Sequence, residues 1–158
     1  KCVNHEIDVI AEKENLEKLL IEAKFHNTSG IRTDVHVSLY TKARFDDLKD
    51  KYKFDKAYLF TNTKITSDAL SYALCTNMGI VSWSYPQNES LRDLIEKFKL
   101  YPITIIDSLS QTQKQTLLEN HIVLVRDICK NKESLDILGL HPDKKNQIHK
   151  EAELICKT

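Results

Sequence analysis

Two short stretches near the N-terminus alternate apolar and polar residues, which is the period of a half-buried β-strand. They cover residues 5–11 and 20–25 and are separated by a polar turn near Asn15. The apolar face consists of Ile7, Val9 and Ala11 in the first stretch and Ile21, Ala23 and Phe25 in the second. The pattern therefore predicts a β-hairpin with one apolar and one polar face.

The polar face of this hairpin is expected to gather charged side chains. The two apolar faces coincide only in registers that keep the alternation in step, because a slip of one residue turns every side chain over. One such register pairs Val9 with Ile21. It sets Asp8 directly opposite Glu22, and Lys24 follows at a diagonal distance of about 7–8 Å that a lysine can span. The spacing thus predicts two carboxylates and an ammonium group at one place.

Opposed carboxylates on a sheet need a counter-charge, because like charges destabilise a strand pair. Mg²⁺ would supply it, since this ion is typically held by one or two carboxylates, keeps several waters and suits substrates that bear phosphate. Such an ion can polarise a phosphoryl oxygen and lower the pKa of a bound water, which Lys24 could orient. The alternative is a solvated strand face on which Glu22 and Lys24 are ordinary surface residues.

Beyond the hairpin, helical and strand patterns alternate as far as residue 100. The predicted elements are a helix from Thr33 or Asp34 to about Tyr52, a strand over 55–62, a helix that begins at Thr66 or Ser67 and ends at Gly79, a strand over 80–83 and a helix over 89–99. This alternation predicts an α/β fold, a mixed β-sheet flanked by helices. Lys42 and Arg44 lie in the first helix, where they either contact phosphates beside the acidic pair or simply solvate the helix.

Strand signals fade after Tyr101 and Pro102, which mark a domain boundary. The predicted domains are therefore residues 1–100 and a small all-α helical segment, residues 101–158. Four short helices are expected in this segment, over 109–120, 123–131, 134–138 and 143–156.

The composition is that of a globular protein. Of the 158 residues, 41% are hydrophobic and 29% are charged, so a core can form. No run approaches the ~18–20 consecutive apolar residues of a membrane helix, and no secretory signal opens the chain, so the expected compartment is the cytoplasm. The 23 basic and 23 acidic residues cancel, which argues against a protein held on nucleic acid by its overall field but leaves room for a local basic groove.

The four cysteines are widely spaced and include no CxxC pair, so neither a zinc cluster nor a disulfide scaffold is predicted. They are Cys2, Cys75, Cys129 and Cys156. Four unpaired thiols fit a reducing interior, and Cys75 is expected on the inner face of its helix as a small hydrophobe. The six histidines show no spacing typical of a metal site.

The acidic hairpin resembles the metal-binding core of the PD-(D/E)XK nuclease superfamily, in particular its Mrr-type restriction endonuclease domains. The matching residues are Asp8 within residues 5–11 and Glu22-Ala23-Lys24 within residues 22–27. Residues 59–69, Gly79-Ile80 and residues 91–95 are similar to the strand–helix–strand–helix that completes that restriction-endonuclease-like domain. The resemblance covers roughly residues 1–100 and is closest to the subgroup attached to ATP-cone domains, which would lie upstream of this chain.

The resemblance implies that Asp8 and Glu22 ligate Mg²⁺, or Mn²⁺ in its place, with the carbonyl of Ala23 as a backbone ligand. It also implies that Lys24 lies beside the attacking water and that the reaction is hydrolysis of a DNA phosphodiester bond. Cutting both strands commonly needs two such sites, so a homodimer is one arrangement to expect. Two alternatives stay open: a non-catalytic DNA-binding or regulatory module that keeps the nuclease fold, and an interaction domain unrelated to nucleic acid.

The C-terminal segment and the N-terminus differ from the family patterns that they resemble. Residues 101–158 are similar in layout to tandem helix-hairpin-helix repeats, with Asn120-His121-Ile122 and Gly139 at the hairpins in place of Gly-x-Gly. At the N-terminus, domains of this family begin with a helix that here would precede Lys1. Without that helix, one face of the sheet is expected to be exposed and a further acidic ligand to be missing.

Overall fold

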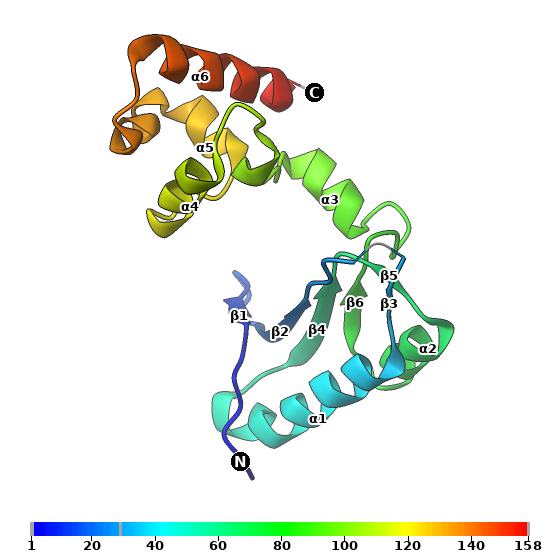
Figure 1. Ribbon diagram of the computed structural model, residues 1–158. Coiled ribbons are helices and arrows are strands. Elements are labelled where there is room, and N and C mark those ends of the chain that lie inside the picture. Colours follow the sequence, from blue (N-terminus) through cyan, green and yellow to red (C-terminus); the bar gives the residue numbers. More distant parts are fainter. Residues whose placement is uncertain (1, 29, 158) are drawn as a thin grey trace. The chain divides into compact units, whose positions relative to one another are not determined.

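A computed structural model describes residues 2–28 and 30–157 of the chain, and Figure 1 shows its ribbon. The chain divides into two compact units, Lys1–Asp93 and Leu94–Thr158, here called the N-terminal unit and the C-terminal unit.

The N-terminal unit is built on a four-stranded sheet in the order β1-β2-β4-β6. Its strands are β1 (Val9–Glu12), β2 (Lys18–Lys24), β4 (Lys56–Thr61) and β6 (Gly79–Val81). β1 runs antiparallel to β2, whereas β2, β4 and β6 are mutually parallel. The mixed sheet that the sequence predicts is therefore confirmed, and the carboxyl ends of its three parallel strands meet at one edge.

Two helices pack against one face of this sheet (Figure 1): α1 (Val35–Tyr52) and α2 (Ser67–Cys75). The side chains of Asp34 and Thr66 cap them by accepting hydrogen bonds from backbone N–H groups of the first turn, as predicted. The core between helices and sheet consists of Leu20, Leu48, Phe54, Ala57, Leu59, Ala73, Met78 and Ile80.

A second, two-stranded parallel sheet was not predicted from the sequence. It joins β3 (Arg32–Thr33) to β5 (Lys64–Ile65). Two residues are too few to show an alternating pattern, so this pairing depends on tertiary structure and leaves no periodic signal in the sequence.

The prediction of which hairpin face is buried was wrong. Leu20 is fully buried under α1, and Glu22 lies on the same face of β2. On the opposite face, the side chain of Val9 is 46% exposed and that of Phe25 is 69% exposed. The reason is that the helices cover the face that carries Leu20 and its neighbours on β4. The alternation therefore predicted correctly which residues share a face, but not which face is buried.

Gly79 also has a different role from the predicted helix end. α2 already ends at Cys75, and Gly79 begins β6. A Cβ atom at Gly79 would lie 2.3 Å from Cε1 of the Tyr58 ring, so glycine is needed here for the close packing of two strands.

The last helix that the sequence predicts before residue 100 is α3 (Leu91–Phe98), which begins at the end of the N-terminal unit. Ser90 caps it, because its hydroxyl accepts a hydrogen bond from the backbone N–H of Asp93.

The C-terminal unit continues as an all-helical segment, as predicted. Its elements are the 3₁₀ helix η1 (Ile103–Ile105), α4 (Gln111–Glu119), α5 (Val125–Lys130), the 3₁₀ helix η2 (Lys132–Leu138) and α6 (Pro142–Lys157). His121 after α4 and Gly139 after η2 both adopt left-handed backbone conformations that end their helices. In the described part of the chain, every helix is too short or too polar to cross a lipid bilayer.

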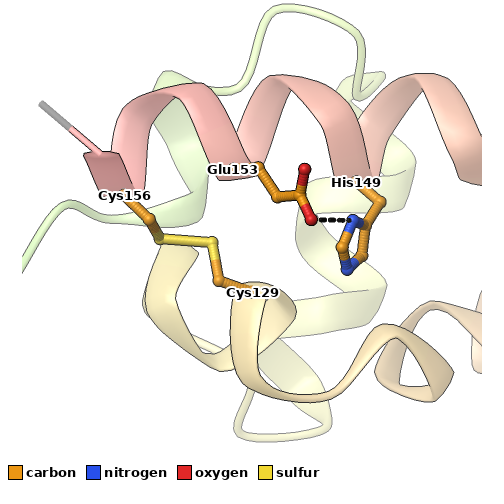
Figure 2. The surroundings of a disulfide bond; sticks show 4 residues. All are labelled: Cys129, His149, Glu153 and Cys156. Carbon is orange, nitrogen blue, oxygen red and sulfur yellow. Dashed lines mark ion pairs between the residues drawn. A yellow bond between two sulfur atoms is a disulfide. The ribbon is translucent and has the colours of Figure 1, made fainter.

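The predicted set of four unpaired thiols is wrong. Cys129 in α5 and Cys156 in α6 form a disulfide across the C-terminal unit, close to the ion pair between His149 and Glu153 (Figure 2). The two cysteines are 27 residues apart, so the sequence shows no local spacing that would reveal the bond. Cys2 and Cys75 are free, and Cys75 is exposed rather than on the inner face of α2.

Candidate functional site

The predicted hairpin register is the one observed. β1 and β2 pair Val9 with Ile21 and Ala11 with Leu19. Continued by one residue, this register sets Asp8, which directly precedes β1, opposite Glu22 near the carboxyl end of β2.

The carboxylate of Asp8 is bound to the backbone of β2. Its Oδ2 accepts a hydrogen bond of 2.7 Å from the N–H of Ala23. In an extended strand the N–H and C=O of one residue point to the same edge. The carbonyl of Ala23 is therefore directed toward the side on which Asp8 lies.

Glu22 is half-buried and forms an ion pair with a residue of α1. Nη1 of Arg44 donates a hydrogen bond to Oε2 of Glu22, and the side chains of Arg44 and Glu22 are 6% and 14% exposed, respectively. The Arg44 guanidinium also lies over the ring of Tyr40, 4.5 Å from its centroid. Its Nε is buried without a hydrogen-bond partner among the described residues. Arg44 is thus held at the acidic pair by a carboxylate and an aromatic ring.

The charges around Glu22 act on one another. Burial raises the pKa of the Glu22 carboxyl above its ordinary value, and the Arg44 guanidinium opposes this rise. The negative charge of Asp8 raises the same pKa further, while the ammonium of Lys24 lowers it. These influences indicate that the two predicted carboxylates and the predicted lysine lie close enough to interact, with Lys24 exposed to solvent.

The structure does not bring Lys42 to this site. Its ammonium pairs with Asp46 on the same helix and lines a hollow with Lys56 and Met78, at the amino-terminal ends of β4 and β6. Residues two apart on a helix point about 200° away from each other. Lys42 and Arg44 therefore point to different sides of α1, and it is Arg44 that pairs with Glu22.

Sequence reasoning missed the residues that extend the carboxyl edge beyond this acidic pair. Asn62, directly after β4, accepts a hydrogen bond from the N–H of His26 and donates one to the carbonyl of His26, both at 2.8 Å. A polar residue immediately after a buried strand was the available signal. The amide thus fixes the backbone that follows Lys24.

The donor set fits a hard cation held by two carboxylates. Oδ1 of Asp8 and Oε1 of Glu22 accept no hydrogen bond from the described residues, so each carboxylate keeps one oxygen for a ligand. Within residues 2–28 and 30–157, no group of three or more His, Cys, Asp or Glu side chains could enclose a metal. This arrangement suits Mg²⁺, which keeps several of its waters, better than a metal that needs a complete set of protein ligands.

The chain is similar to proteins of known sequence and structure. Residues 101–156 match the family described as AF1548-like, C-terminal. A protein of Archaeoglobus fulgidus described as uncharacterized is 37% identical over 155 residues, which cover 98% of this chain and 87% of that protein. The crystal structure of a protein of unknown function, AF1548, has a TM-score of 0.83 and 36% identity, and the match covers 99% of this chain and 84% of that one. The chain therefore belongs to the AF1548-like family.

Proposed function

We propose that this protein is a Mg²⁺-dependent endonuclease that hydrolyses phosphodiester bonds of DNA. The observation that carries the proposal is the meeting of Asp8 and Glu22 at the ends of two paired strands, each with an unused carboxylate oxygen and with Lys24 beside them. The resemblance of Asp8 and Glu22-Ala23-Lys24 to the PD-(D/E)XK motif supports the same conclusion.

In this proposal Asp8, Glu22 and the carbonyl of Ala23 hold the ion. When bound, Mg²⁺ supplies a Lewis acid for the phosphoryl group and lowers the pKa of water. Lys24 is on the same face of β2 as Glu22 and is solvent-exposed, so its ammonium can orient the attacking water and offset negative charge on the phosphate. Burial raises the pKa of Glu22, and Arg44 opposes this rise and so favours the ionised form that a metal ligand requires.

The direct test is nicking of supercoiled plasmid DNA with Mg²⁺ or Mn²⁺. We expect cleavage by the wild-type protein, loss of cleavage in Glu22→Gln, and cleavage reduced by at least about a hundredfold in Lys24→Ala, the range for loss of a general acid–base or electrostatic group. Glu12→Gln, at the far end of β1, is the matched control and should cleave normally. Wild-type cleavage by Lys24→Ala would exclude its proposed role.

Metal binding can be tested without cleavage. Mg²⁺ should raise the melting temperature of the wild-type protein, because the ion binds the folded state. The gain should disappear in Asp8→Ala and persist in Lys24→Ala and Glu12→Gln. Equal gains in wild-type protein and Asp8→Ala would mean that the ion binds elsewhere.

One observation favours a second candidate, a non-catalytic DNA-binding or regulatory module. Arg44 already neutralises Glu22, as a metal ion would. In that case Glu22→Gln and the wild-type protein should bind a DNA duplex equally well, and neither should nick it with Mg²⁺ or Mn²⁺ present. Cleavage that depends on Glu22 decides for the enzyme.

A further inference from the structure

The carboxyl edge of the sheet also carries a polar pocket of about 550 Å³. It is lined by residues that follow the three parallel strands: His26 after β2, Asn62 and Lys64 after β4, and Trp83 after β6. In open α/β sheets, ligands bind in the crevice outside the carboxyl ends of the strands. A volume of this order is typical of small-molecule sites.

Two cations stand side by side at this pocket. Arg32 on β3 and Lys64 on β5 are direct partners in the parallel two-stranded sheet, and both line the pocket. Like charges placed directly opposite each other destabilise a strand pair. Neither residue forms an ion pair with any described residue, and no aspartate or glutamate of the described chain lines the pocket. This surface is therefore built to receive an anion.

An aromatic side chain adjoins the cations. Trp83 is 41% exposed, although large aromatic side chains are usually well buried. Its backbone N–H donates a hydrogen bond of 3.0 Å to the carbonyl of Thr63, next to Lys64 in the chain. An exposed indole that lines the same pocket as paired cations is an arrangement on which a nucleobase can stack while its phosphate meets the basic groups.

A buried network of hydroxyl groups adjoins the pocket through Thr63 and His26, which both line it. The hydroxyl of Thr33 lies 2.8 Å from the hydroxyls of both Thr61 and Thr63, and these three side chains are buried. Nε2 of His26 lies 3.5 Å from the same Thr33 hydroxyl. A buried network of this kind orders the strands that carry the cations, so little reorganisation is needed on binding.

We propose that this pocket binds one nucleotide, with its phosphate at Arg32 and Lys64 and its base against Trp83. The inference goes beyond the proposed nuclease, because such binding requires neither Mg²⁺ nor cleavage. A free mononucleotide and one unit of a single DNA strand offer the same phosphate and base, and their relative affinities distinguish these two sources.

Trp83 is the only tryptophan of the chain, so its fluorescence reports on this pocket alone. The whole protein is titrated in EDTA, which prevents metal binding and cleavage, with deoxyadenosine 5′-monophosphate, a single-stranded oligodeoxynucleotide and inorganic phosphate. Nucleotide should quench the fluorescence in a saturable way, and phosphate alone should compete without stacking. Stronger binding of the oligonucleotide identifies a DNA strand as the natural source, whereas equal or stronger binding of the mononucleotide identifies a free nucleotide.

Charge variants complete the test. Lys64→Ala should weaken binding roughly tenfold or more, as expected for loss of a charge-assisted hydrogen bond, and should lower the salt dependence of oligonucleotide binding by roughly one counterion. Lys51→Ala, which removes an exposed lysine of α1 outside the pocket, should leave binding unchanged. The proposal is overturned if neither nucleotide quenches Trp83, or if Lys64→Ala and Lys51→Ala bind alike. If nucleotide quenches Trp83 but the protein cleaves DNA under no condition, the nucleotide pocket stands and only the proposed nuclease is rejected.

Discussion

The two units of the chain bury different kinds of residue. Among the described residues, every buried polar or charged side chain belongs to the N-terminal unit: Thr33, Ser38, Thr41, Arg44, Thr61, Thr63, Ser82 and Ser90. The buried core of the C-terminal unit is apolar and is crossed by a disulfide. Buried polar groups contribute little net stability unless all are satisfied, whereas an apolar core and a cross-link stabilise directly.

This difference assigns binding and catalytic chemistry to the N-terminal unit and structural stability to the C-terminal unit. Polar groups buried near a sheet edge can hold charges in fixed positions, which binding and catalysis require, at a cost in stability. In the N-terminal unit, Arg44 contacts Glu22 of the acidic pair. Thr63 lines the polar pocket and is hydrogen-bonded with Thr33, which is hydrogen-bonded with Thr61. The same division predicts that substitutions in the two units change different properties.

The largest loss of stability is expected in the C-terminal core. Ile148 in α6 is fully buried, so Ile148→Ala should lower the free energy of unfolding by about 2–5 kcal/mol through lost burial and a residual cavity. Leu154→Ala, in the same helix but 69% exposed, should change it by less than about 0.5 kcal/mol. Urea denaturation followed by circular dichroism measures both. Equal losses would mean that α6 does not pack as described.

Loss of the disulfide should come next. Replacing Cys129 and Cys156 by serine opens a loop closed over 27 residues and should cost roughly 2–4 kcal/mol. Hydrogen exchange read by mass spectrometry should show faster exchange in α5 and α6 and unchanged exchange in β2 and β4. Cys75→Ser, which removes an exposed free thiol, is the control. Unchanged exchange in α5 and α6 of the double-serine variant would show that the bond does not stabilise this unit.

An intermediate effect is expected at the ion pair of the N-terminal unit. Arg44→Ala leaves the half-buried Glu22 without its counter-charge and should cost about 2–3 kcal/mol, less than the roughly 3–5 kcal/mol of a fully buried pair. Adding Glu22→Gln to this variant should recover part of the loss, because no uncompensated charge then remains. A double-mutant cycle measured by urea denaturation gives both values. If the second substitution deepens the loss, packing rather than charge is what Arg44 supplies.

The features that could be predicted from the sequence are those that depend on residues close together in the chain. The register that sets Asp8 opposite Glu22 follows from alternation over a few neighbouring residues, and the caps at Asp34 and Thr66 depend on one turn of chain. Such local rules require no knowledge of the rest of the fold.

The missed features all depend on residues that are distant in sequence. The buried face of β2 is decided by α1, and the disulfide joins two helices 27 residues apart. The facing of Arg32 and Lys64 requires a two-residue pairing between segments that have no pattern of their own. For Arg44, the sequence could predict only a positive charge in a helix near the acidic pair. Its ion pair with Glu22 depends on how α1 crosses the sheet.

The smallest effect is expected from a polar contact that ties the N-terminal segment to α1. The carboxylate of Asp47 accepts hydrogen bonds from the N–H groups of Cys2 and Val3, at 2.5 and 3.4 Å, and lies 2.8 Å from Nε2 of His5. A hydrogen bond with the Cys2 thiol holds the pKa of Asp47 well below its ordinary value, and those from the N–H of Cys2, from His5 and from the N–H of Val3 lower it further. A lowered pKa in the folded state means that the contact stabilises the protein fully above the unfolded pKa, about 3.9, and is lost as the pH falls below it.

Asp47→Asn should therefore be less stable than the wild-type protein at pH 7, and the difference should shrink between pH 5 and pH 3, roughly the range around the unfolded pKa. Asp50→Asn, at an exposed position of the same helix, serves as the control for removing one negative charge from α1. Urea denaturation at several pH values measures the difference, and exchange at the backbone amides of Cys2 and Val3 locates it. A difference that grows on acidification would have the wrong sign for a carboxylate stabilised by donors, and would mean that the N-terminal segment is held to α1 by something other than Asp47.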